Sequence, residues 1–131
     1  MSIRIVRLGT PRAGDEGLRI GTVRRPSRGV RKTALAERDF CDVWYPNLAP
    51  SEALLELHFP ITDDDLVAWR RFSRAFFAEM KQKDASRTLD LLAALSAQSN
   101  LSVGCYCAEE TRCHRSLLRE LLTARRANMA P

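Results

Sequence analysis

The sequence has 131 residues, a length typical of a single domain. Hydrophobic residues make up 45% and charged residues 28%, which excludes a disordered tail or a collagen-like fibre and supports one sizeable core. No run approaches the roughly 18 apolar residues of a transmembrane helix, and charges interrupt the apolar stretch at the N-terminus, unlike in a secretory signal. We therefore expect a cytoplasmic protein without a membrane partner, whose four cysteines, Cys41, Cys105, Cys107 and Cys113, are reduced.

Positive charge is concentrated in the first third of the chain. Residues 1–38 hold ten Lys/Arg and three Asp/Glu, whereas residues 39–131 hold eleven and thirteen. A basic segment of this kind suits an anion such as nucleic acid, phosphate or an acidic metabolite. An arginine-rich surface that only keeps the protein soluble is the alternative.

Two short strands are predicted near the N-terminus. Apolar and basic residues alternate over residues 3–8, and a second strand is expected over residues 18–23, after a loop that contains a proline and several glycines. Residues 33–41 are compatible with a helix. Ser51 can cap a short helix over residues 52–58.

Longer helices are predicted in the second half. Thr62 and Asp65 resemble a capping box at the start of a helix over residues 62–82, in which apolar residues recur at spacings of three and four. The aromatic residues among them are Trp69, Phe72 and Phe76, and an aromatic stripe at this spacing is typical of a core. Ser86 can cap the next helix, over residues 86–97.

The C-terminal part completes a strand and helix alternation. Residues 101–107 form a short apolar run typical of a buried parallel strand, and residues 113–128 favour a last helix. The pattern predicts a Rossmann-like α/β fold, with residues 1–131 forming one compact domain and a mostly parallel sheet flanked by helices. In such sheets ligands bind beyond the carboxyl ends of the strands.

The turn between residues 107 and 113 carries the strongest chemical signal. A helix start favours an anion, and the guanidinium of Arg115 can hold a phosphate or carboxylate with two donors. Cys113 and His114 would lie in the first helical turn, where the pKa of a thiol tends to fall, and Cys107 could face the same crevice. In the first interpretation, Cys107 or Cys113 is a nucleophile and His114 carries a proton.

Two other interpretations stay open. Zinc could be held by the four potential ligands of the turn, although the segment lacks the paired C-x-x-C typical of such sites; the four are Cys105, Cys107, Cys113 and His114. Alternatively, the cysteines fill the core while His114 and Arg115 form local pairs. We expect neither a metal nor a cofactor.

The turn also resembles a known family. The residues Cys107-Ala108-Glu109, followed by Cys113-His114-Arg115-Ser116-Leu117-Leu118, are similar to the C-terminal signature of the domain-of-unknown-function 488 (DUF488) family. Further matches, in order, are to the YeaO-like branch of that family: Arg24, Arg28-Gly29-Val30, Asn47-Leu48-Ala49-Pro50-Ser51, Trp69 and Phe72. The chain departs from the branch at Val23 and at Pro26-Ser27, and it combines features of the branch and of the wider family.

The resemblance implies a compact α/β protein whose crevice lies between the basic N-terminal loop and the Cys-His-Arg turn, with no established reaction. The predicted catalytic residues are Cys107, Cys113 and His114, and the predicted anion-binding residues are Arg24, Arg28, Arg115 and Ser116. We expect a small enzyme for a phosphate-like anionic ligand. The alternative is a non-catalytic module for nucleic acid or a phosphorylated ligand, but residues 19–32 contain no aromatic side chain on which bases could stack.

Overall fold

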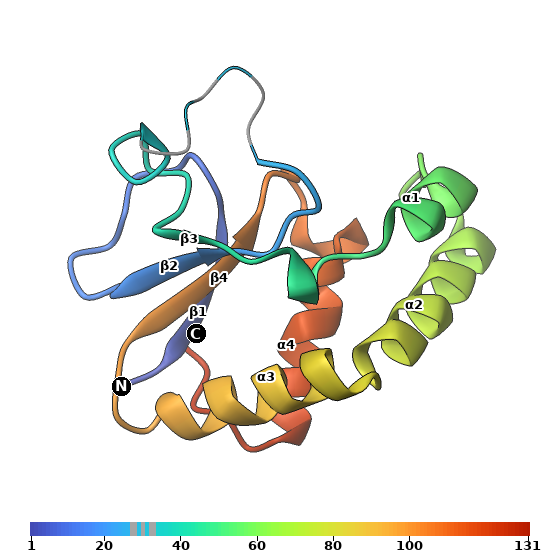
Figure 1. The fold of residues 1–131 in the computed structure, drawn as a ribbon. Coiled ribbons are helices and arrows are strands. Elements are labelled where there is room, and N and C mark those ends of the chain that lie inside the picture. Colours follow the sequence, from blue (N-terminus) through green and yellow to red (C-terminus); the bar gives the residue numbers. More distant parts are fainter. Residues whose placement is uncertain (27–28, 30, 32–33) are drawn as a thin grey trace.

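A parallel sheet forms the centre of the computed structural model, which describes residues 1–26, 29, 31 and 34–131 (Figure 1). In spatial order its strands are β1 (Ile3–Arg7), β4 (Leu101–Cys105), β2 (Leu18–Gly21) and β3 (Val43–Trp44). β4 pairs in parallel with both of its neighbours, so that Val103 lies between Ile5 and Ile20. The predicted α/β fold with a parallel sheet is confirmed.

The helices lie on one side of this sheet. They are α1 (Glu52–His58), α2 (Leu66–Met80), α3 (Lys83–Leu95) and α4 (His114–Ala124), with short 3-10 turns at Pro46–Leu48 and Glu110–Arg112. Figure 1 shows α2, α3 and α4 on this side and long loops on the other. Within the described part of the chain, every helix is too short or too polar to span a bilayer.

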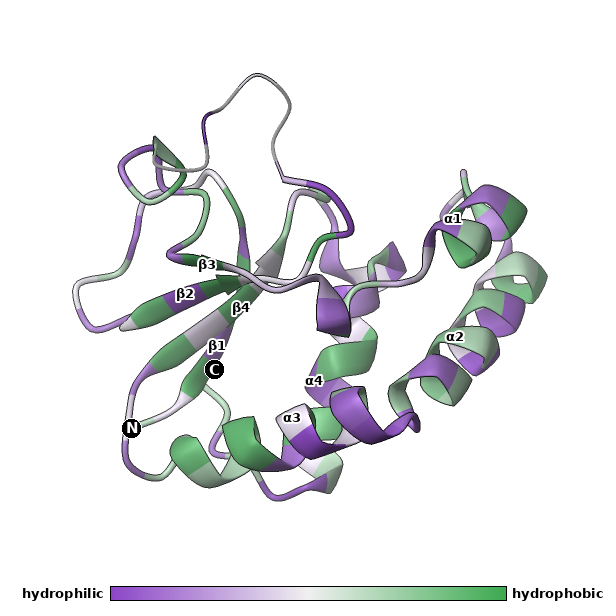
Figure 2. Ribbon diagram, viewed as in Figure 1, coloured by the Kyte–Doolittle hydropathy of each residue, from purple (hydrophilic) through white to green (hydrophobic). Residues whose placement is uncertain are grey.

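The main core fills the space between the sheet and the helices. It joins Ile3, Ile20 and Val103 of the strands to Phe72 and Phe76 of α2. The two aromatic rings are stacked with their centroids 6.0 Å apart. Figure 2 shows mainly apolar residues in the strands, with hydrophilic ones among them in β1 and β2, and helices in which apolar and polar residues alternate. The prediction that the aromatic stripe belongs to the core is confirmed.

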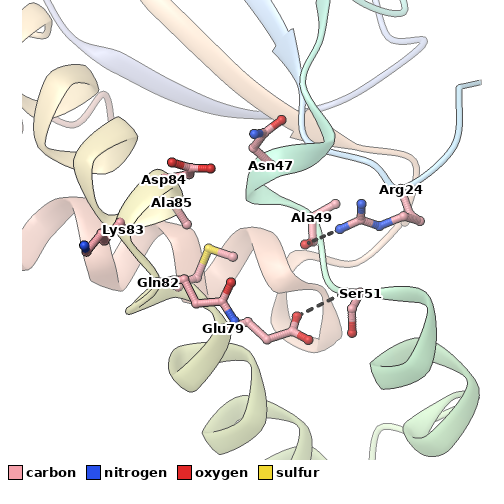
Figure 3. Close-up of a pocket in the computed structure, with 10 residues that line it drawn as sticks. Arg24, Asn47, Ala49, Ser51, Glu79, Gln82, Lys83, Asp84 and Ala85 are labelled. Atoms are coloured by element: carbon pink, nitrogen blue, oxygen red, sulfur yellow. Dashed lines mark hydrogen bonds between the residues drawn. The ribbon is translucent and has the colours of Figure 1, made fainter.

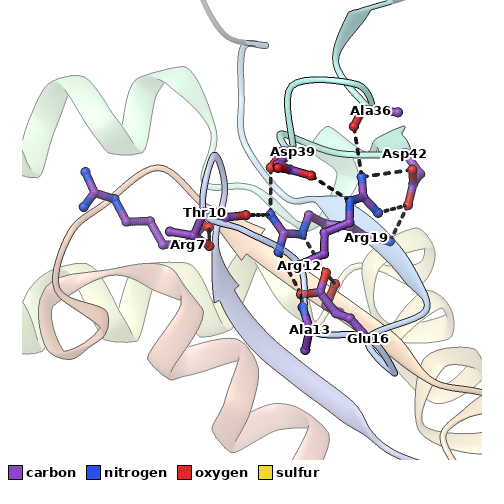
Figure 4. A network of polar contacts seen from close by, with 10 residues as sticks. Arg7, Thr10, Arg12, Ala13, Glu16, Arg19, Ala36, Asp39 and Asp42 are labelled. Carbon is purple, nitrogen blue, oxygen red and sulfur yellow. Dashed lines mark hydrogen bonds and ion pairs between the residues drawn. The ribbon is translucent and has the colours of Figure 1, made fainter.

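The opposite face of the sheet is covered by the loop between β1 and β2, which a buried ion pair holds in place. Arg19 of β2 is 0% exposed and donates to the Glu16 carboxylate at 2.6 and 2.7 Å (Figure 4). Its remaining terminal nitrogen donates to the carbonyl oxygens of Thr10 and Asp39, at 2.9 and 2.7 Å. Ser102 of β4 donates its hydroxyl to Glu16 at 2.9 Å. Arg19 therefore stabilises the fold and presents no donor to an external anion.

A second arginine of the basic segment is also held internally. Arg12 donates to both carboxylate oxygens of Asp42, at 2.7 and 3.1 Å, and to Asp39 at 3.3 Å (Figure 4). Together with Arg19, it connects the first loop to the segment that precedes β3. Part of the positive charge in the first third thus has a structural role.

Helix starts differ from the sequence prediction in two cases. Ser51 caps α1 as predicted, accepting a hydrogen bond from the Leu54 amide at 3.1 Å. α2 begins later than predicted, because the Asp65 carboxylate, and not Thr62, caps it by accepting from Ala68. α3 begins earlier, at Lys83, and the amide of Ser86 already donates to a helical carbonyl. Ser86 is therefore not a cap.

The remaining elements differ mainly in length. β2 ends at Gly21 and β4 at Cys105, each two residues before the predicted end, and α4 ends at Ala124. The two-residue strand β3 was not predicted, since an element this short has no measurable periodicity. Residues 35–39 form turns and not the expected helix, while Thr33 lies outside the described residues.

Candidate functional site

The predicted catalytic residues gather at the carboxyl end of β4. Cys105 is the last residue of this strand, Cys107 follows in the loop, and Cys113 and His114 stand at the start of α4. β4 has β1 on one side and β2 on the other, so its end lies at the middle of the sheet edge. This is the edge at which parallel α/β sheets bind ligands.

Two thiols of the cluster interact directly. The thiol of Cys105 donates to the sulfur of Cys107, with the two Sγ atoms 3.7 Å apart. Cys105 is 7% exposed, whereas Cys107 is exposed. This hydrogen bond, a second one from Cys113 and the positive charge of Arg115 lower the pKa of Cys107 to about 3, against the opposing effect of burial. The interaction with Cys107 raises the pKa of Cys105, which remains a thiol. The arrangement stabilises a thiolate at Cys107.

Arg115 supplies a buried positive charge beside this thiolate. The residue is only 4% exposed, and its Nη2 atom donates a hydrogen bond to the carbonyl oxygen of Cys107 at 2.7 Å. Its Nε atom is buried without a hydrogen-bond partner, and no carboxylate of the described residues lies within 4.0 Å of the guanidinium. Since a buried charge is costly unless a counter-charge compensates it, the Cys107 thiolate is the partner that this site offers.

His114 is fixed in one orientation. Its Nε2 lies 2.6 Å from the carbonyl oxygen of Thr22, which can only accept, so Nε2 carries the proton. In the neutral imidazole the lone pair is then on Nδ1, which lies 3.8 Å from the Sγ of Cys113. The ring also packs against Phe76, with the centroids 5.7 Å apart. The unprotonated Nδ1 atom of His114 therefore faces the sulfur of Cys113.

The thiol of Cys113 has a lowered pKa but is inaccessible to a ligand. A hydrogen bond with Cys105 lowers the pKa of Cys113, and His114 lowers it further, but the residue is only 1% exposed. The hydroxyl of Ser116 donates to the Cys113 carbonyl at 2.9 Å, within the first turn of α4. Of the two predicted nucleophiles, Cys107 is the one that a ligand can reach.

A metal could be held by part of the cluster. The donor atoms of Cys105, Cys113 and His114 lie within 4.8 Å of one another, and all three residues are buried. Two thiolates and one imidazole nitrogen are a ligand set that zinc accepts. Cys107 lies outside this group. The expectation that the protein uses no metal stays a prediction.

A cavity of about 480 Å³ opens onto the cluster. Cys105, Cys107 and His114 form part of its wall. The other lining residues come from the segment after β2, from α1 and the residues that flank it, and from the loop after β4: Val23, Arg24, Arg25, Pro50, Glu52, Leu55, Glu56, Phe59 and Tyr106. Most of the surface that lines this cavity is apolar. The cavity suits a small ligand that exposes an electrophilic atom to Cys107.

Arg24, a predicted anion-binding residue, lines the same cavity but is partly occupied. Its Nε and Nη2 donate to the carbonyl oxygens of Pro50 and Ala49, at 2.9 and 3.0 Å. Arg24 also lines a neighbouring cavity of about 520 Å³, where Glu79, Asp84 and Lys83 give mixed charge (Figure 3). Of the side-chain nitrogens of Arg24, Nη1 is the one without a hydrogen bond to the described residues, so it can face a ligand.

The other predicted anion-binding residues are distributed unevenly. Arg115 donates to the backbone carbonyl of Cys107, and the Ser116 hydroxyl donates to the backbone carbonyl of Cys113. Arg28 lies outside the described residues. Arg25, which the sequence did not single out, lines the cavity and forms an exposed ion pair with Glu52. Its position next to Arg24 in the sequence was the feature that could have indicated that it lines the same cavity. Thr22 was also missed, because it acts through its backbone carbonyl, which no side-chain pattern reveals.

Comparison with known families places this sequence in one of them. The family model DUF488-N3a, described as the active DUF488-N3 subclade, matches residues 3–126. No match was found among curated proteins or solved structures. The narrower resemblance to the YeaO-like branch stays a prediction. Because the family model covers nearly the whole chain, including the strand end and the Cys-His-Arg helix start, this protein belongs to the DUF488 family.

Proposed function

We propose that this protein is a small thiol-dependent enzyme, in which the Cys107 thiolate attacks an electrophilic carbon of a small anionic substrate. One observation carries the proposal: the buried Arg115 guanidinium lacks a carboxylate partner among the described residues and lies beside the exposed Cys107. A buried cation placed in this way favours the thiolate, which is the reactive form. The description of the matching subclade as active agrees with an enzyme.

The cavity supports a particular kind of substrate. Leu55, Phe59 and Val23 offer apolar contacts, while Arg25 and the free Nη1 of Arg24 offer positive charge. The exposed ion pair of Arg25 with Glu52 is of a kind that contributes about 0–1 kcal/mol, so a ligand can displace it. We therefore propose a substrate with a compact apolar body and one anionic group.

The proposed reaction is a group transfer to water. The Sγ atom of Cys107 forms a bond to the electrophilic carbon, and the bond from that carbon to its leaving group breaks, with the electron pair leaving on that group. Water then attacks the same carbon, the carbon–sulfur bond breaks, and Cys107 is regenerated as a thiolate. The two protons of water end on the product hydroxyl and the leaving group. His114, whose Nε2 is held by Thr22, positions Cys113 and is not in our scheme the donor to the leaving group.

Two alkylating reagents of nearly equal size test both parts of the proposal. Iodoacetamide is neutral and iodoacetate is anionic. At pH 6, we expect Cys107 of the folded chain to react faster than in the urea-unfolded chain, where its thiol is protonated. The rate ratio of iodoacetate to iodoacetamide should exceed that of glutathione, and inorganic phosphate should slow both reactions.

Matched variants identify the residue. Cys107→Ser should remove the fast reaction, whereas Cys41→Ser should leave it unchanged, because Cys41 is buried and its pKa is raised by that burial. The proposal is wrong if Cys107 reacts no faster folded than unfolded. If the reaction is fast but shows no preference for iodoacetate and no protection by phosphate, the anionic substrate is wrong.

A further inference from the structure

We infer that Cys107 is a site of oxidative modification and that it forms a disulfide with Cys105 when the protein meets hydrogen peroxide. The Sγ atoms of the two residues are already 3.7 Å apart. A disulfide requires a sulfur–sulfur distance of about 2.05 Å, so roughly 1.7 Å of movement closes the bond. The disulfide rests on this geometry, and only its consequence, the loss of the nucleophile, rests on the proposed function.

The two residues differ in the way that such a pair requires. Cys107 is exposed in the loop after β4, where peroxide can reach it, while Cys105 is 7% exposed at the end of the strand. Residues 106–109 belong to neither a helix nor a strand, so Cys107 can approach Cys105 without breaking a strand or helix hydrogen bond. The exposed member therefore reacts first and the buried member resolves it.

Exposure sets the order of events, and Arg115 lies beside the residue that reacts first. The guanidinium favours the thiolate that attacks peroxide. Cys105 is only 7% exposed, and its Sγ lies 3.7 Å from that of Cys107, so it meets the oxidised sulfur of Cys107 before it meets peroxide.

The steps balance in atoms and electrons. The Cys107 thiolate attacks one peroxide oxygen, the oxygen–oxygen bond breaks, and hydroxide leaves and takes up a proton as water. Cys105 then attacks the sulfenic sulfur, the sulfur–sulfur bond forms, and the hydroxyl leaves with the thiol proton as a second water. Two thiols are oxidised by two electrons while one hydrogen peroxide is reduced to two waters.

Other pairings are distinguishable in the same chain. Cys113 contributes to the hydrogen bonding around Cys107, so it is the competing resolving residue. Trypsin separates the candidates, because cleavage after Arg87 and Arg112 leaves Cys105 and Cys107 in one peptide and Cys113 in another. Cys41 lies in a third, between Arg38 and Arg70.

The experiment treats the reduced, folded protein with hydrogen peroxide in the presence of a chelator, blocks the remaining thiols, and maps the peptides by mass spectrometry. We expect the peptide of residues 88–112 to lose two hydrogens, to resist alkylation, and to regain both thiols on reduction. In Cys105→Ser, Cys107 should instead proceed to sulfinic acid. Cys41→Ser is the matched control and should behave as the parent chain.

Two results overturn the inference. One is a disulfide that joins the peptide of Cys113 to that of residues 88–112. The other is a parent chain in which Cys107 is oxidised to sulfinic acid while Cys105 stays alkylatable. Neither result affects the fast alkylation of reduced Cys107 on which the proposed function depends. Conversely, slow alkylation together with disulfide formation contradicts only the proposed function.

Discussion

Arg115 donates a hydrogen bond from Nη2 to the carbonyl oxygen of Cys107 at 2.7 Å, although eight positions separate the two residues along the chain. The first turn of α4 directs the guanidinium back toward the loop that leaves β4. One contact therefore fixes the loop backbone and brings a buried positive charge close to the thiol of the same residue. The geometry and the electrostatics of the site depend on the same side chain.

Removing this charge should change the titration of Cys107. In Arg115→Met, a side chain of comparable length without charge, we expect the pH at which alkylation slows to rise by about 1–3 units, as when an opposite charge is withdrawn from an ionised group. For Arg115→Lys, we expect this pH to lie between the values of the parent chain and of Arg115→Met. The measurement is the pH dependence of the iodoacetamide rate at the peptide of residues 88–112, with circular dichroism to verify folding. An unchanged profile in the folded variant would show that Arg115 does not stabilise the thiolate.

The parent protein should react almost independently of pH over the neutral range. Because Cys105 and Cys113 donate to Cys107 and Arg115 lies nearby, the pKa of Cys107 is lowered to about 3, and the thiolate persists well below pH 7. An ordinary thiol, with a pKa of about 8.5, loses about tenfold in rate per pH unit below that value. We expect the Cys107 rate to change by less than about twofold between pH 8 and pH 6. A tenfold decrease per unit in this range contradicts the lowered pKa.

The buried Glu16–Arg19 pair should be essential for stability. Glu16→Gln leaves Arg19 buried without a counter-charge, and we expect a loss of about 3–5 kcal/mol in the free energy of unfolding. Asp15→Asn is the matched control, because the pair of Asp15 with Arg4 is exposed and should contribute at most about 1 kcal/mol. Urea denaturation at pH 7 measures both. Equal losses in the two variants would contradict the structural role of the buried pair.

The same pair predicts a pH dependence. Burial raises the pKa of Glu16, but the hydrogen bonds from Arg19 and Ser102 outweigh this effect and lower the pKa below its usual 4.5. The stabilisation is therefore fully present above the pKa of the unfolded chain and is lost as the pH falls through the lower pKa of the folded state. Between pH 6 and pH 3, Glu16→Gln should lose less stability than the parent chain. A parallel decrease in both proteins would contradict this assignment.

Gly17 should tolerate no side chain. Its φ of +78° is disfavoured for other residues, and an added Cβ would lie 1.9 Å from the carbonyl oxygen of Asn100. Because the clash is with backbone, Gly17→Ala should shift the loop before β2 and destabilise the protein by more than about 1 kcal/mol. Gly14→Ala, in the same loop, meets nothing within 4 Å and should be nearly neutral. Thermal unfolding of the two variants makes the comparison, and equal melting temperatures would exclude this close approach.

Local patterns in the sequence were sufficient for the type and order of most elements. Ser51 and the aromatic spacing of Phe72 and Phe76 specify α1 and α2, because capping and helical periodicity involve residues only three or four positions apart. The Cys-His-Arg turn was likewise visible, since its chemistry is carried by consecutive residues. The choice of caps at Thr62 and Ser86 was wrong, because several residues near a helix start can accept the same hydrogen bond and packing selects among them.

Only the tertiary structure decided which of these residues can act. The sequence by itself determined a parallel α/β fold and a thiol-rich helix start, because both depend on short-range patterns. It could not show that Cys113 is buried while Cys107 is exposed. Nor could it show that Arg115 lacks a carboxylate partner among the described residues, or that Arg19 forms a buried ion pair with Glu16. Burial and charge pairing depend on residues brought together from distant parts of the chain, and they determine the protonation state and accessibility of each thiol.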